Sequence, residues 1–261
     1  MGIKTKKARV KAREVLRYCG IDFAAEAQIE DILYSRGIDM ILSKRIEGSE
    51  ARISFKNNKA IVTVNSEIRY PKKRNFVLAH ELGHYELHRN SLKTIHIDNS
   101  DSLSSWFSGG EHEIEANAFA SELLMPEESF QLLFKDSLFS IELINKISEH
   151  YQASLTSVLL QYLNYGKIPI CMIYSKDAKV IWSNAAEDYI LKYIPNGISV
   201  PTNSVAGEFY FEQITYDEPE EIEAAAWYSN DFMYPEHKEN KFYERCISLP
   251  NNSLISVVWN K

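Results

Sequence analysis

Apolar residues recur at two different spacings in the first third of the chain. Residues 7–19 and 24–36 carry them at helical spacing, and the two runs end at Gly20 and Gly37. Apolar spacing of this kind followed by glycine predicts two helices. Three short runs rich in Ile and Val follow, at 38–44, 51–55 and 60–65. They predict strands, the last two joined by the turn KNNK at 56–59.

Two longer segments in the middle of the chain also have a helical pattern. The first, RNFVLAHELGHYELHR at 74–89, is apolar on several faces and predicts a buried helix. The second, EHEIEANAFASELLM at 111–125, predicts a helix that stops at Pro126. The residues between them are rich in Ser, Asp and Gly and predict a long loop. Its Trp106 and Phe107 are compatible with a cleft wall or with an ordinary surface loop.

The pattern changes again after residue 166. Residues 127–166 stay helical and include a helix pair with a short turn at 152–153 and Ser154 as the N-cap of the second helix. Beyond them, alternating apolar residues predict strands at 170–174, 179–183, 241–249 and 253–260. We expect a helix at 186–194 and a solvated acidic loop at 217–223. The whole pattern predicts an α+β fold with a domain boundary near residue 166.

Composition narrows the class of protein. The net charge of −7 and the pI of about 5.6 argue against a protein that binds nucleic acid in bulk. The basic run at 4–13 is expected to be the solvated face of the first helix. Three cysteines without CxxC spacing, Cys19, Cys171 and Cys246, indicate free thiols in a reducing compartment. No apolar run is long enough to span a bilayer, so we expect a cytoplasmic protein without a membrane partner.

The stretch HELGH at 80–84 contains the pattern HExxH. Residues four apart share one face of a helix, so His80 and His84 can direct nitrogens at one metal ion. Glu81 lies beside that face and can reach a water on the metal, as a general base does. Zinc suits such a site because it takes nitrogen and oxygen ligands in a tetrahedron and keeps one position for water. The plainer interpretation is two histidines buried in a core helix.

The third ligand has several candidates. His88 lies two helical turns from His80, too far along one straight helix to share an ion, so a capping or supporting role for a ligand histidine suits it better. His96 in the loop is equally weak. The helix at 111–125 offers four glutamates, namely Glu111, Glu113, Glu115 and Glu122.

Helical periodicity favours Glu113 among the four. It shares a face with Ala116, Asn117 and Ala120, and the alanines would allow a close approach to the HExxH helix. Glu115 and Glu111 lie on the side that also carries Glu122. Asn117 can then hydrogen-bond to one ligand histidine and fix its ring.

HELGHYELH together with EIEANAFASELLMP resembles the ImmA/IrrE family of metallo-endopeptidases, whose motif is HELGH followed by E-x-x-A-N-x-F-A-x-x-L-L-M-P. The clear resemblance covers about residues 8–130. It implies a mainly helical, gluzincin-type zincin domain at 1–130 with a small N-terminal sheet and one catalytic Zn²⁺. It also implies a helix-turn-helix-like segment at 131–166 and a smaller α+β, GAF-like domain at 167–261.

The same resemblance implies the roles of individual residues. His80, His84 and Glu113 match the metal ligands, and Glu81 matches the general base. Family members characteristically cut a partner regulator, often a helix-turn-helix repressor, and thereby switch on stress-response or mobile-element genes. The group that stabilises the oxyanion stays open, with His88, His96 and His112 as candidates; Tyr85 is expected to point away from the ligand face.

Two other functions are compatible with the sequence. The chain can be a non-catalytic, zinc-containing regulator that acts by binding protein or DNA. Direct DNA reading is disfavoured, because residues 154–166 offer only Gln161 and Asn164 for base contacts. Alternatively, the C-terminal domain senses a ligand, with aromatics such as Trp182, Trp227, Tyr228 and Trp259 lining a pocket, although such residues more often pack in a core.

Overall fold

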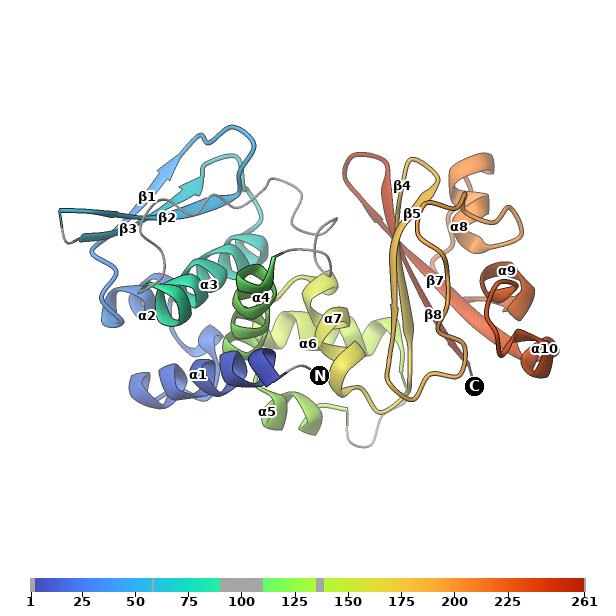
Figure 1. Cartoon of the computed structure of the whole chain (residues 1–261), viewed down its shortest axis with the longest axis horizontal. Coiled ribbons are helices and arrows are strands. Elements are labelled where there is room, and N and C mark those ends of the chain that lie inside the picture. Colours follow the sequence, from blue (N-terminus) through green and yellow to red (C-terminus); the bar gives the residue numbers. More distant parts are fainter. Residues whose placement is uncertain (1–2, 58, 90–109, 135–138, 261) are drawn as a thin grey trace. The chain divides into compact units, whose positions relative to one another are not determined.

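A computed structural model gives the structure of the chain, and it describes residues 3–57, 59–89, 110–134 and 139–260. These residues form two compact units, 1–161 and 162–261. The first unit holds a small sheet and most of the helices, and the second holds a larger sheet (Figure 1). The predicted mixture of helices and sheets, an α+β fold, is confirmed.

The first unit begins with helices and a three-stranded sheet. Its helical elements before the metal motif are α1 (Ile3–Cys19), the 3₁₀ turn η1 (Ala24–Glu26) and α2 (Ile29–Ser35). Its strands are β1 (Met40–Lys44), β2 (Ala51–Lys56) and β3 (Lys59–Asn65). The strand order is β1-β3-β2, with β1 parallel and β2 antiparallel to β3.

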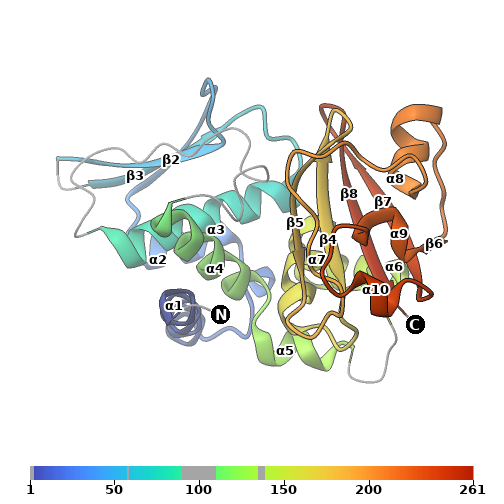
Figure 2. The ribbon, with the colours of Figure 1, turned by 45° about the vertical axis from the view of Figure 1, so that its right-hand side comes forward.

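Helix α3 (Pro71–His88) lies between this sheet and helix α4 (Glu111–Leu124), as Figures 1 and 2 show. Proline at the first position suits the helix start, because its missing N–H would have no partner there. Ile53, Val62 and Val64 are fully buried on the inner face of the sheet. Because α3 is covered on two sides, its middle is buried almost all round, as its several apolar faces predict.

The remaining helices of the first unit follow the predicted pattern. They are α5 (Glu127–Leu132), α6 (Ile141–Tyr151) and α7 (Leu155–Tyr165), which runs into the second unit. The Ser154 hydroxyl accepts a hydrogen bond from the Ser157 N–H at 3.1 Å, so the predicted N-cap is confirmed. Gln152 takes the left-handed conformation at the turn between α6 and α7.

Two expectations for the first unit are wrong. Residues 24–36 do not form one helix, because the chain leaves η1 in an extended conformation at Ala27 before α2 starts. The basic run at 4–13 is not simply a solvated face. Arg9 is only 6% exposed and its guanidinium bonds to Glu122 of α4 at 3.2 Å, a buried partner far away in the sequence.

The second unit is built on a five-stranded antiparallel sheet. Its strands are β4 (Cys171–Lys176), β5 (Lys179–Ala185), β6 (Glu220–Glu223), β7 (Lys241–Leu249) and β8 (Ser253–Asn260). Their order is β5-β4-β8-β7-β6. The helical elements are α8 (Val205–Gly207), the π-helical turn η2 (Glu208–Glu212), α9 (Ala224–Tyr228) and α10 (Tyr234–His237).

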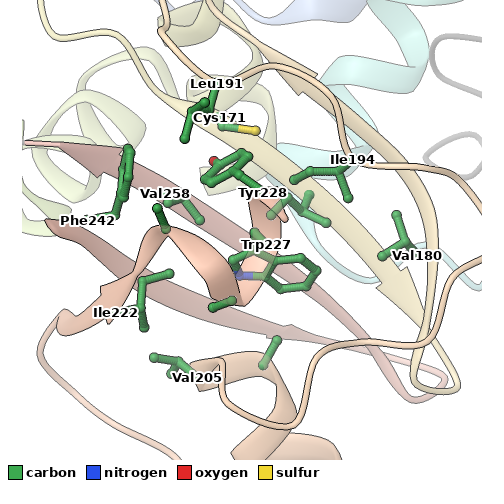
Figure 3. Close-up of a cluster of buried hydrophobic side chains, with 14 of the residues drawn as sticks. Cys171, Val180, Leu191, Ile194, Val205, Ile222, Trp227, Tyr228, Phe242 and Val258 are labelled. Atoms are coloured by element: carbon green, nitrogen blue, oxygen red, sulfur yellow. The ribbon is translucent and has the colours of Figure 1, made fainter. Parts of the chain in front are cut away.

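The core of the second unit lies between its sheet and the short helices. Figure 3 shows Trp227 and Tyr228 of α9 in the middle of this cluster, next to Cys171 and Phe242 from the sheet. Trp182 and Trp259 are also buried. All four aromatic residues that could have lined a ligand pocket, Trp182, Trp227, Tyr228 and Trp259, are therefore buried and contribute to packing.

Two expectations for the second unit are also wrong. Residues 186–194 are not helical, because the Asp231 carboxylate accepts the N–H groups of Lys192 and Tyr193 at 2.7 and 2.6 Å. Helical backbone would have directed those groups to carbonyls one turn earlier. The acidic stretch 217–223 is not only a loop, since its last four residues form the edge strand β6 with Ile222 buried.

Within the described ranges, no helix combines the length and the apolar character needed to cross a bilayer.

Candidate metal centre

The buried middle of α3 holds the two histidines of the HExxH motif. His80 and His84 are 3% and 1% exposed, and their Nε2 atoms lie 2.9 Å apart. Their spacing of four residues places both rings on the face that meets α4. Imidazoles at this distance have either a shared proton or a shared cation between them.

Helix α4 brings a carboxylate to the same point. One oxygen of Glu113 lies 3.2 Å from His80 Nε2, and the other lies 3.3 Å from His84 Nε2. Burial alone would raise the pKa of Glu113, but hydrogen bonds and charge from His80 and His84 outweigh it and hold this pKa well below its ordinary value. The carboxylate is therefore ionised and ready to accept a cation.

The chemistry and spacing of these donors fit a zinc ion. Tetrahedral zinc with bonds of about 2.0–2.1 Å places neighbouring ligand atoms about 3.3 Å apart. The Nε2 atoms of His80 and His84 lie 2.9 Å apart, and they lie 3.2 and 3.3 Å from the two different oxygens of Glu113, distances close to that edge length. The three side chains thus form a group able to hold one metal ion.

Asn117 fixes the orientation of His80. Its Oδ1 lies 2.9 Å from His80 Nδ1, and the amide is buried. Because Oδ1 accepts, Nδ1 carries the proton, and a metal ion on His80 would be held by Nε2, the ring nitrogen on the side of Glu113. Asn117 occupies the place expected of a residue that supports a ligand histidine.

Glu81 lies between the two histidines in the sequence and is 1% exposed. Its position directly after His80 puts it at the edge of the ligand face of α3. The Glu81 carboxyl group is thus buried, one residue after His80 in α3.

His88 stands next to the metal group without joining it. Its Nδ1 lies 3.1 Å from His84 Nδ1, and its Nε2 lies 2.8 Å from Glu115. The exposed His112 stacks on the His88 ring, with centroids 4.2 Å apart. His88, His112 and Glu115 form a second group with metal-ligand chemistry.

Two other predicted candidates that the structure describes, Glu122 and Tyr85, have partners outside the metal group. Glu122 is fully buried and pairs with Arg9 and Arg13, and burial raises its pKa in spite of those two charges. Glu111 is exposed at the start of α4. The Tyr85 hydroxyl donates to the Gly37 carbonyl at 3.4 Å, on the side of α3 that faces the sheet. His96, Trp106 and Phe107 are outside the described residues.

Sequence reasoning missed the contact of Glu115 with His88. Helical periodicity placed Glu115 on a different face of α4 from Glu113, so the sequence predicted no role for Glu115. The signal lay in the third histidine, since His88 continues the four-residue spacing and reaches one turn further along α4. A histidine that binds a metal commonly hydrogen-bonds through its other ring nitrogen to a second side chain, and that side chain can in turn hydrogen-bond to a carboxylate.

Comparison with known proteins gives this arrangement a context. Residues 35–161 match the family model Peptidase_M78, described as the IrrE N-terminal-like domain, and this range contains the complete metal group. A curated relative, the "Uncharacterized immunity region protein 2" of Bacillus phage phi105, is 40% identical over 72 residues. That alignment spans 28% of this chain and 41% of the phage protein, so the chain covers less than half of the relative's length.

A solved structure shares the fold of the whole chain. It is described as a "Mycobacterium tuberculosis transcriptional regulator" and superposes with a TM-score of 0.63 at 14% sequence identity. The match covers 100% of this chain and 77% of the other one. At this identity the likeness concerns the fold alone.

Proposed function

We propose that this chain, whose residues 35–161 belong to the ImmA/IrrE family of metallopeptidases, is a zinc-dependent endopeptidase that hydrolyses a regulatory protein. One observation carries the proposal. Two imidazole nitrogens and an ionised carboxylate from two helices converge within 3.3 Å of one another, and a buried group of acceptors of this kind is stable around a cation.

His80, His84 and Glu113 would hold the ion. The chemistry that bound zinc supplies is polarisation of the scissile carbonyl and a water whose pKa is lowered toward neutrality. The Glu81 carboxylate accepts a proton from the attacking water and donates it to the leaving amine nitrogen. Asn117 and His88 hold the two ligand rings in place.

The proposed substrate is a helix-turn-helix repressor, whose cleavage would switch on stress-response or mobile-element genes. The name of the phage relative supports a role in immunity regulation, because it places that protein in an immunity region. Direct DNA binding is not part of the proposal. Gln161, one of the two candidates for base contacts, is buried, and its amide donates to the Met125 carbonyl at 2.7 Å.

The proposal divides the chain by function. Residues 1–130 are the gluzincin-type zincin domain, and residues 131–166 are a helix-turn-helix-like segment. Residues 167–261 are a GAF-like domain that senses a ligand and controls the peptidase. We place this activity in the cytoplasm, where free thiols such as buried Cys171 stay reduced.

The experiment is to mix the zinc-loaded protein with purified repressors encoded beside its gene and to follow intact repressor by mass spectrometry. We expect a defined cut with the native chain and none with Glu81→Gln, which keeps the metal ligands. Repressors that stay intact under all conditions, with zinc bound, would contradict the endopeptidase.

The rival function is a non-catalytic, zinc-containing regulator, and the description of the structural neighbour as a transcriptional regulator favours it. The same Glu81→Gln variant separates the two. If the variant still regulates the target genes in cells, the proton transfer by Glu81 is not needed and the rival holds. If regulation disappears together with cleavage, the enzyme holds.

A further inference from the structure

Beside the proposed metal ligands, three side chains form an uninterrupted chain of contacts. His84 Nδ1 lies 3.1 Å from His88 Nδ1, and His88 Nε2 lies 2.8 Å from a Glu115 oxygen. The His84 and His88 side chains are only 1% and 4% exposed, and that of Glu115 is 18% exposed. Such contacts are little weakened by solvent.

With a metal on His84, the contact between the two Nδ1 atoms allows one arrangement of protons. Two ring nitrogens form a hydrogen bond only when one carries a proton and the other offers a lone pair. If His84 gives the lone pair of Nε2 to a metal, its own Nδ1 must carry the proton. His88 Nδ1 is then the acceptor, and neutral His88 carries its proton on Nε2. That proton points at the Glu115 carboxylate, which accepts it.

Resting on the metal site proposed above, we infer that His88 and Glu115 form a relay that holds His84 in its metal-binding tautomer. The Glu115 carboxyl oxygen accepts the proton on His88 Nε2, and the lone pair of His88 Nδ1 then accepts the proton on His84 Nδ1. His84 thereby presents a lone pair at Nε2. Glu115 and His88 are positioning residues, since neither meets the substrate or the metal.

The relay also implies that only one of the two candidate metal groups, the one with His80 or the one with His112, can be filled at a time. His88, His112 and Glu115 have ligand atoms within 4.8 Å of one another and resemble a second site. A metal on His88 Nε2 would leave the His88 proton on Nδ1, where it would meet the proton on His84 Nδ1. Both groups cannot be filled while this contact persists. Of the two groups found among the described residues, the one at His80, His84 and Glu113 therefore holds the ion, and His112 stacks on the His88 ring.

The test compares zinc binding and histidine tautomers in the native chain and four variants. Glu115→Ala removes the acceptor, and Glu115→Gln keeps an acceptor oxygen. His112→Ala removes a ligand of the rival site, and Glu128→Ala removes an exposed carboxylate of α5 as a matched control. Zinc stoichiometry and affinity are measured by competition with a chelator. Tautomers are read from long-range ¹H–¹⁵N spectra of the zinc-loaded protein at a pH where His88 is neutral.

We expect one zinc per chain and about 10- to 100-fold weaker binding in Glu115→Ala, with a smaller loss in Glu115→Gln. His112→Ala and Glu128→Ala should bind as the native chain does. The zinc-loaded native protein should show His88 with its proton on Nε2, and Glu115→Ala should lose this preference.

Two zinc ions per native chain, falling to one in His112→Ala, would overturn the relay. So would native affinity and an unchanged His88 tautomer in Glu115→Ala. A native chain that binds zinc with the expected dependence on Glu115 but cuts no repressor would contradict the proposed peptidase and leave the relay standing.

Discussion

Gly83 of α3 lies so close to Ala116 of α4 that a Cβ atom on Gly83 would be 3.2 Å from both the Cα and the carbonyl oxygen of Ala116. This contact sets the distance between the two helices that carry the metal group. Glu113 is one turn before Ala116, and the close approach lets its carboxylate reach both His80 and His84. The glycine in HELGH therefore serves the geometry of the metal group.

Replacing Gly83 should weaken metal binding by separating α3 from α4. Gly83→Val adds three carbons at the contact, whereas Gly83→Ala adds one, so zinc affinity should fall in the order native, alanine, valine. Alanine improves intrinsic helix propensity by about 1 kcal/mol, and a loss of affinity would therefore oppose the propensity effect. Isothermal titration with zinc measures it.

Gly110 offers the matched control for this series. It is the N-cap of α4, and a Cβ there would meet nothing within 4 Å. Gly110→Ala should bind zinc as the native protein does. Equal affinities for Gly83→Val and Gly110→Ala would disprove the role of the close helix contact.

Asn117→Ala should lower zinc affinity by about 10- to 100-fold, because His80 would lose the acceptor for its Nδ1 proton. Asn117→Asp keeps an oxygen in that place and should retain most of the affinity. Chelator competition on both variants is the measurement. The supporting role fails if the alanine and aspartate variants bind zinc equally well.

Glu122 should be essential for stability rather than for metal binding. Glu122→Ala would leave the 6% exposed Arg9 with a buried charge that has lost its carboxylate partner. Breaking a buried ion pair from one side costs about 3–5 kcal/mol of unfolding free energy. Urea unfolding followed by circular dichroism measures this loss.

The exposed pair of Arg45 and Glu67, with side chains 73% and 62% exposed, supplies the control. Glu67→Ala should change the unfolding free energy by less than about 0.5 kcal/mol, as surface substitutions usually do. Similar losses for Glu122→Ala and Glu67→Ala would show that α1 is not fastened to α4 by the buried pair.

The buried Glu244 should make the second unit less stable as pH rises. Burial raises the pKa of Glu244 above its ordinary value of 4.5, even though the Val205 N–H donates to it at 2.9 Å. The folded state then holds this proton more tightly than the unfolded chain. Its contribution to stability is complete below pH 4.5 and is lost as pH rises through the raised pKa.

Glu244→Gln removes that titration, so the native chain should lose stability relative to this variant as pH rises above 4.5. Unfolding free energies across a pH series test this, with Glu239→Gln as a control whose side chain is 89% exposed. Parallel pH profiles for the native chain and Glu244→Gln would refute the expectation.

The metal group was accessible to sequence reasoning because its geometry is local to two helices. The four-residue spacing of His80 and His84 fixes their shared face, and the alanine on the stripe of Glu113 indicates the helix side that can approach closely. The structure places Glu113 and Asn117 where periodicity predicts them. The relay proposed for His84 could be inferred only from the contact of His84 with His88 in the structure.

The expectations that proved wrong concern segments whose structure depends on contacts with distant parts of the chain. Arg9 was taken for a surface charge because its partner Glu122 is 113 residues away. Residues 186–194 have a helix-like composition, but the Asp231 carboxylate from beyond α9 holds their backbone in a non-helical form. Local patterns carry no information about such partners, and tertiary contacts override propensity.

The most direct test of the central claim is the zinc content of Glu113→Ala after equilibrium dialysis, compared with the native chain and with Glu111→Ala. Glu113 and Glu111 are acidic residues in the first turn of the same helix. The native chain and Glu111→Ala should each hold one zinc, while Glu113→Ala should bind more than about 100-fold more weakly, since a lost ligand costs more than a lost supporting contact. Native zinc affinity in a folded Glu113→Ala would contradict the metal centre proposed between α3 and α4.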